Sequence, residues 1–155
     1  MRMKFAALLC VLGIAAPGMG LAQSSAPGWS YGYAEGAATA TRVNSDGDVE
    51  ATISCRPPDG ALVVTDHNFR GAARNVQTAA LRIGQGLTIN VPASSEGRGR
   101  RARVVISLPQ KPPILAGVGR DDELSVTVNN VTHTYGTGSG KQMEEVAYAC
   151  WQGGT

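Results

Sequence analysis

The chain has 155 residues, with 14 lysines and arginines, 12 aspartates and glutamates, and a formal charge of +2. This length predicts one domain with an adequate core and leaves no room for a second domain. The small charge excess excludes a dedicated nucleic-acid-binding protein, which would carry a strong basic excess.

Residues 1–22 have the features of a secretory signal peptide. Arg2 and Lys4 provide a positive start, 5–16 form an apolar run, and small residues lead up to Ala22. We predict cleavage after Ala22, and the apolar run is too short to span a bilayer. Cleavage would remove 22 of the 155 residues and leave 133, with 12 basic and 12 acidic side chains. The protein is therefore expected to be exported, either to the periplasm or out of the cell.

The cysteines agree with export. Cys10 would leave with the signal peptide, so Cys55 and Cys150 form one pair in an oxidising compartment, where a disulfide is expected. Such a bond closes a loop of about 95 residues and stabilises the fold by roughly 4–5 kcal/mol in the chain-entropy model. The alternatives are two buried free thiols or two metal ligands, but the sequence places no cluster of His or Asp nearby.

After a flexible leader at Gln23–Gly28, the pattern predicts a single β-rich domain over Trp29–Thr155. Apolar residues mostly recur with period two, and turn residues follow at short intervals, as in antiparallel sheets. Irregular segments are expected at Asp66–Arg74 and Pro92–Gly99, and a helical turn at Ile114–Asp122. The expected strands are a first strand running from Trp29 toward Val43, then Val49–Cys55, Ala61–Thr65, Val76–Ile83, Leu87–Val91 and Ala102–Leu108.

The clearest hairpin covers Glu123–Tyr135. Asn129 and Asn130 form a two-residue loop that tolerates positive φ and so sets the register. Val126 should then face His133. The opposite face should carry a ladder of polar pairs, Thr127 with Thr132 and Ser125 with Thr134.

A C-terminal helix is predicted after the glycine-rich segment 136–140. Ser139 and Gln142 have the spacing of an N-cap and its reciprocal partner. Met143, Val146, Ala147 and Cys150 form one apolar stripe, while Glu144 and Glu145 point away. Cys150 would thus lie on the buried side of the helix, facing the inward side of the strand that ends at Cys55. The predicted fold is a β-sandwich or rolled sheet with a short helix held across it by a disulfide.

Four short motifs accompany this layout: a tryptophan near the mature start, a strand ending in cysteine, a late hairpin ending near an aromatic residue, and a helix ending in cysteine. They are Trp29, Ile53-Ser54-Cys55, His133-Thr134-Tyr135-Gly136 and Val146-Ala147-Tyr148-Ala149-Cys150. On these motifs the chain resembles small exported bacterial proteins related to the accessory proteins of type VI secretion. The resemblance implies fold and disulfide more than activity. Such proteins often carry phenylalanine where Tyr135 stands, and they have a central tryptophan that this chain lacks.

Neither histidine is placed in an evident catalytic motif. His133 lies on the apolar face of the hairpin, which favours a half-buried structural role. His67 follows Asp66 directly, and consecutive strand residues point to opposite faces, so Asp66 is badly placed to orient it. We expect His67 in a solvated loop. No Gly-x-Ser-x-Gly motif is present, and a hydrolase using His67 or His133 is the competing hypothesis.

Two surface features could bind ligands. Arg98, Arg100, Arg101 and Arg103 are the densest basic cluster, and guanidinium groups suit phosphate and carboxylate. The favoured interpretation of this cluster is a solvated charge run that protects a sheet edge. Trp29, Tyr31 and Tyr33 fall on one strand face and could form a stacking platform for sugars, or simply part of the core.

The favoured hypothesis is an exported, non-enzymatic binding or accessory module of the bacterial envelope or of a secretion system. Its partner would be another envelope or secreted protein. The alternatives are an envelope protein that binds an anionic polymer or glycan through Arg98–Arg103, and the hydrolase. The sequence predicts no catalytic set, no cofactor, no metal site, no nucleic-acid partner and no membrane span in the mature chain.

Overall fold

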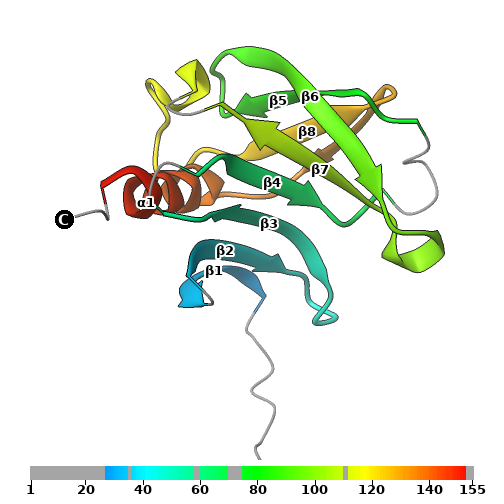
Figure 1. The fold of residues 1–155 in the computed structure, drawn as a ribbon, viewed down its shortest axis with the longest axis horizontal. Coiled ribbons are helices and arrows are strands. Elements are labelled where there is room, and N and C mark those ends of the chain that lie inside the picture. Colours follow the sequence, from blue (N-terminus) through cyan, green and yellow to red (C-terminus); the bar gives the residue numbers. More distant parts are fainter. Residues whose placement is uncertain (1–26, 35, 58–59, 70–74, 110–111, 153–155) are drawn as a thin grey trace, which may run out of the picture.

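The computed structural model describes residues 27–34, 36–57, 60–69, 75–109 and 112–152, so the predicted signal peptide lies outside the described residues. These residues form nine strands, two short 3-10 helices and one α-helix (Figure 1). The strands are β1 (Gly28–Ala34), β2 (Ala37–Val43), β3 (Val49–Cys55), β4 (Leu62–Asp66), β5 (Thr78–Ile83), β6 (Thr88–Glu96), β7 (Arg103–Leu108), β8 (Leu124–Val128) and β9 (Val131–Thr134). The helices are η1 (Gly99–Arg101), η2 (Pro113–Leu115) and α1 (Ser139–Gln152).

The strands form one antiparallel curled sheet in the order β1-β2-β3-β4-β7-β6-β5-β8-β9. β6 makes the corner, because Thr88–Pro92 pairs with β5 and Ala93–Glu96 pairs with β7. Pro92 lies at the change of partner, where a residue without an N–H is tolerated. The predicted rolled sheet with a C-terminal helix is therefore confirmed.

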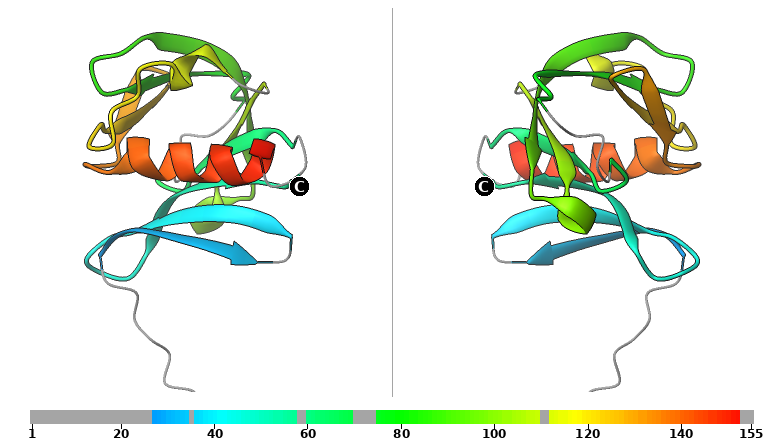
Figure 2. Two further views of the ribbon diagram at one scale, coloured as in Figure 1. Left: turned by 90° about the vertical axis from the view of Figure 1, so that its left-hand side faces the viewer. Right: turned by 90° about the vertical axis from the view of Figure 1, so that its right-hand side faces the viewer.

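Helix α1 lies between the β1–β3 part of the curl and the β5, β8 and β9 part (Figure 2). It packs mainly against β1, β2 and β3. The predicted stripe is confirmed, because Met143, Val146, Ala147 and Cys150 are all buried. The predicted disulfide is also confirmed: Cys150 is bonded to Cys55 at the end of β3, with their Cα atoms 5.8 Å apart.

The core fills the space enclosed by the curl and closed by the helix. Its side chains come from nearly every strand and from α1, which explains why strand alternation was visible in the sequence. The helix itself is too short and polar for a membrane span, and no helix in the described part of the chain is long and apolar enough to cross one. Buried core residues include Ile53, Leu62, Val64, Leu81, Ile106, Leu124, Val126 and Met143.

The late hairpin has the predicted register. Val126 pairs with His133 and Val128 with Val131, and both loop asparagines have positive φ, 49° and 64°. On the other face the hydroxyls of Thr127 and Thr132 lie 2.8 Å apart, and those of Ser125 and Thr134 lie 3.1 Å apart. These pairs are the polar ladder that the sequence indicated.

Several local expectations were wrong. The segment from Trp29 to Val43 is a hairpin of two strands rather than one strand, and Gly36 turns the chain with φ +73°. Most of the expected loop Pro92–Gly99 continues β6, because its backbone pairs with β7 despite its small and polar side chains. β1 begins at Gly28, inside the expected leader.

The predicted N-cap was also wrong. Ser139 is the first residue of α1, and its hydroxyl donates backward to the carbonyls of Tyr135 (2.6 Å) and Gly136 (2.8 Å). This contact ties the start of the helix to the end of β9. The expected helical turn near Ile114 is the 3-10 turn η2, which is shorter than the predicted segment.

Candidate functional site

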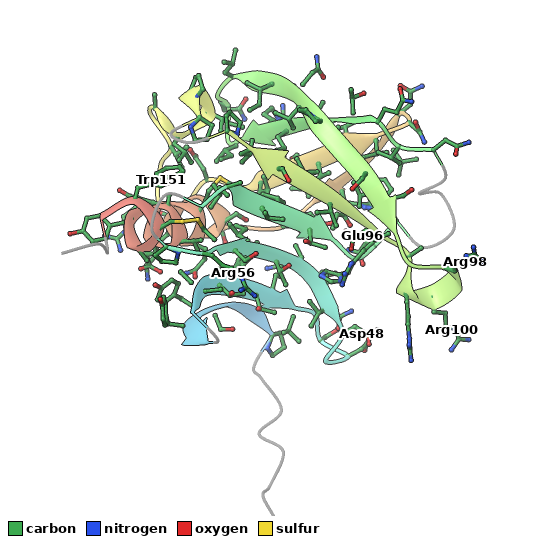
Figure 3. All side chains as sticks on the ribbon, in the orientation of Figure 1. Asp48, Arg56, Glu96, Arg98, Arg100 and Trp151 are labelled. Atoms are coloured by element: carbon green, nitrogen blue, oxygen red, sulfur yellow. A yellow bond between two sulfur atoms is a disulfide. The ribbon has the colours of Figure 1, made fainter. Side chains whose placement is uncertain are left out.

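The arginine cluster lies on the turn between β6 and β7. Gly97 and Gly99 both have positive φ (76° and 59°), and a Cβ at Gly97 would collide with the carbonyl of Arg101. These two glycines let the chain form the 3-10 turn η1, which carries Arg100 and Arg101 off the sheet. Figure 3 shows Arg98 and Arg100 projecting from this turn on the same side of the molecule as Asp48.

Three of the arginines line one cleft, which we call the arginine cleft. Its volume is about 300 Å³, and it is closed on the other side by the β2–β3 turn and by the residue after β4. The sequence identified the arginine cluster as a possible anion site, and the structure places three of its members together with His67 around this cleft. The lining residues are Asp48, Val49, His67, Arg100, Arg101, Ala102 and Arg103.

The arginines of the cleft differ in whether they form ion pairs. Arg103 donates to Glu96 through Nη2 (2.8 Å) and Nε (3.1 Å), and both side chains are 47% exposed, so this pair is worth little to stability. Among the described residues, no carboxylate forms an ion pair with Arg100 or Arg101. Within the described residues, the guanidinium groups of Arg100 and Arg101 therefore line the cleft without an ion-pair partner.

His67 is the one histidine among the residues that line the cleft. Its Nε2 is buried and has no hydrogen-bond partner in the described part of the chain. Burial lowers the pKa of His67, the charge of Arg103 lowers it further, and the Asp66 carboxylate partly opposes both. His67 is consequently neutral near pH 7, so the positive charge of the cleft comes from the arginines.

A second polar group lies inside the curl, and we call it the buried polar cluster: Asp66, His133 and Tyr135. Asp66 is fully buried at the end of the central strand β4, and its Oδ2 lies 3.1 Å from His133 Nδ1. Its Oδ1 accepts the Asn68 backbone N–H at 2.7 Å. The His133 ring packs on Phe69 with centroids 4.2 Å apart. Two residues separated by 67 positions in the chain are therefore joined across the interior.

Burial shifts the pKa values of two members of this cluster, Asp66 and Tyr135. Burial raises the pKa of Asp66, and Tyr135, the Asn68 N–H and His133 oppose that rise. Burial and the nearby Asp66 charge raise the pKa of Tyr135, whose hydroxyl has no hydrogen-bond partner of good geometry in the described chain. The Tyr135 carbonyl accepts the Trp29 indole N–H at 3.0 Å, so the cluster also connects the two edge strands.

The Asp66–His133 pair has two of the three groups of a hydrolytic triad. His133 is one quarter exposed and, among the described residues, no serine, threonine or cysteine is hydrogen-bonded to its ring. The sequence analysis considered Asp66 as a partner of His67, whereas its partner in the structure is His133. The useful signal was alternation in β4, where Leu62, Val64 and Asp66 all point inward.

The three aromatic residues of β1 are divided by the structure. Trp29 is half-buried against the core, and Tyr33 is 62% exposed. Tyr31 instead lines a groove with Tyr148 of α1, a residue that was not among the predicted site residues. A helix and a distant strand contribute one tyrosine each, which no local pattern could indicate.

Metal ligands are not grouped in the described part of the chain, which holds no cluster of three or more His, Cys, Asp or Glu side chains able to bind a metal ion. Comparisons with protein families, with curated proteins and with solved structures found no match to this chain.

Proposed function

We propose that this chain is an exported, non-enzymatic binding module of the bacterial envelope or of a secretion system, and that it holds an anionic polymer in the arginine cleft. The observation that carries the proposal is a concavity of about 300 Å³ lined by three arginines, two of them without a carboxylate partner among the described residues. Guanidinium groups bind carboxylate and phosphate through parallel hydrogen bonds, which fits an acidic polysaccharide.

Export rests mainly on the sequence of residues 1–22. The Cys55–Cys150 disulfide is compatible with it, because such bonds persist in oxidising compartments. The resemblance to accessory proteins of type VI secretion favours the same location and a partner that is itself an envelope or secreted protein. Genes of a secretion system beside this gene would favour the accessory role over polymer binding.

The test of the proposal is binding to polygalacturonate, a polymer of carboxylate-bearing sugars, measured by titration at several salt concentrations. Binding should weaken steeply between about 0.05 and 0.5 M salt, because exposed charges are screened. Replacing Arg100→Glu with Arg101→Glu should weaken binding by about tenfold, since two favourable contacts become repulsive.

The matched control is Arg56→Glu with Arg82→Glu. Both arginines are exposed, the change in net charge is the same, and neither residue lines the cleft. Figure 3 shows Arg56 well apart from Arg98 and Arg100. Binding that is indifferent to salt, or that falls equally in both double variants, would remove the arginine cleft as the site.

The Asp66–His133 pair favours a second candidate, a hydrolase in which His133 acts as the general base. A panel of envelope polymers would then be cleaved without added metal, and replacing His67 and His133 by alanine would abolish cleavage. A panel without turnover excludes this candidate and leaves the binding module untouched.

A further inference from the structure

We infer that the groove between β1 and α1 binds a neutral saccharide, at a site separate from the arginine cleft. The groove has a volume of about 460 Å³, within the range of about 300–1,000 Å³ that is usual for small-molecule sites. Its two aromatic walls are Tyr31 from β1 and Tyr148 from α1. It shares no lining residue with the arginine cleft.

The two tyrosines leave large apolar faces in contact with water. Tyr31 is 44% exposed and Tyr148 is 64% exposed, and both contribute to the same concavity. The face of a tyrosine ring is electron-rich and packs well against the polarised C–H groups of a sugar ring. Each ring also carries a hydroxyl group that can donate and accept hydrogen bonds, so this pair offers apolar and polar contact together.

The charged side chains of the groove balance each other. Arg120 and Lys141 are positive, Glu144 and Glu145 are negative, and Lys141 Nζ lies 3.6 Å from Glu145 Oε1. An ionic ligand of either sign would meet like charges here, whereas a sugar hydroxyl donates to a carboxylate and accepts from a cation. This balance favours a neutral polyhydroxylated ligand and distinguishes the groove from the arginine cleft.

The groove is also held in place before any ligand binds. The backbone N–H of Lys141 donates to the Arg120 carbonyl at 3.1 Å, and that of Gly140 donates to the Asp122 carbonyl at 3.1 Å. A Cβ at Gly140 would collide with the Gly119 carbonyl, so the turn and the helix approach closely. A preformed groove avoids the entropic cost of ordering its walls on binding.

The experiment titrates the protein with three neutral oligosaccharides, maltohexaose, cellohexaose and hexa-N-acetylchitohexaose, by calorimetry. At least one should bind, with an affinity that stays constant as salt is raised. Tyr31→Ala and Tyr148→Ala should each weaken that binding by about threefold to tenfold, as expected for one lost aromatic contact. Tyr148→Phe should retain it, because the ring face is kept.

The matched control is Tyr33→Ala, since Tyr33 is on the same strand face as Tyr31, is about as exposed as Tyr148 (62% against 64%) and does not line the groove. It should bind like the unmodified protein, as should the Arg100→Glu, Arg101→Glu double variant. Thermal unfolding verifies that each variant is folded. Absence of binding to all three probes, an equal loss in Tyr33→Ala, or binding that falls with salt would overturn the inference, and none of these results bears on polygalacturonate.

Discussion

Asp66 and His67 are consecutive residues at the end of β4, yet they belong to two different polar regions. Asp66 points into the curl and joins the buried polar cluster, whereas His67 points outward and lines the arginine cleft. In the cluster the Asp66 carboxyl group is fully buried and lies within hydrogen-bonding distance of His133 on β9. In the cleft Arg103 forms an exposed ion pair with Glu96 of the neighbouring strand β6. Burial turns polar groups into cross-links, while exposure leaves them available to a ligand.

The largest expected effect on stability is for loss of the Cys55–Cys150 disulfide, which links α1 to β3. Replacing Cys55 and Cys150 by alanine should lower the free energy of unfolding by about 2–5 kcal/mol, because the unfolded chain regains the freedom of a long loop. Thermal unfolding with and without reductant measures this. Reductant should lower the Tm of the unmodified protein and leave the double variant unchanged. A Tm that does not respond in the unmodified protein would contradict the role given to this link.

The second prediction tests the buried polar cluster itself. Asp66→Ala should lower the free energy of unfolding by about 2–3 kcal/mol, because the Asn68 N–H loses its acceptor and His133 Nδ1 loses its hydrogen-bond partner inside the fold. Urea unfolding gives the value. Asp66→Asn should cost less, since the amide oxygen can still accept from Asn68. If Asp66→Ala is as stable as the unmodified protein, the cluster does not cross-link the sheet.

The third prediction uses the pKa of His67, which is lowered in the folded protein by burial and by Arg103. The unfolded chain then binds more protons than the folded chain below about pH 6.5, the ordinary value for histidine. Stability should therefore fall as the pH drops from about 7.5 through this range. In His67→Gln this part of the fall should disappear, as urea unfolding at several pH values would show.

The carboxyl group of Asp66 changes the pH dependence of stability in the opposite direction to His67. Because the pKa of Asp66 is raised, the folded state holds its proton more tightly than the unfolded state, and acidification through that range adds stability. Comparing His67→Gln with Asp66→Asn therefore separates the two contributions. The same pH dependence in His67→Gln as in the unmodified protein would show that His67 is not desolvated.

Strand alternation and turn chemistry made much of the fold predictable. The inward positions of β3 and β7, the register of the late hairpin and the apolar stripe of α1 are all periodic patterns within short segments. The disulfide could be predicted because the alternation of β3 and the helical periodicity of α1 each placed a cysteine on a buried face. β1 and β2 were predicted as one strand because the run of small and β-forming residues is almost continuous. The turn at Gly36 is the single break in that pattern, and it was missed.

The sites were less predictable because they depend on contacts made by the curl. The pairing of Asp66 with His133 joins a central strand to an edge strand, and the groove joins Tyr31 to Tyr148 across most of the chain. The spacing of residues within one segment cannot predict contacts between segments so far apart in the chain. The arginine cluster was visible because it is local, but its position over His67 depends on how η1 folds back beside the β2–β3 turn.

The smallest expected effect on stability is for substitutions in the arginine cleft, the exposed region of the two. Arg100→Glu with Arg101→Glu should change the free energy of unfolding by less than about 0.5 kcal/mol, because neither side chain is paired with a carboxylate among the described residues. The same substitutions should weaken polygalacturonate binding by about tenfold. Urea unfolding and titration on one preparation measure both quantities. A large loss of stability would mean that the cleft arginines hold the fold together, and the contrast between the two polar regions would then fail.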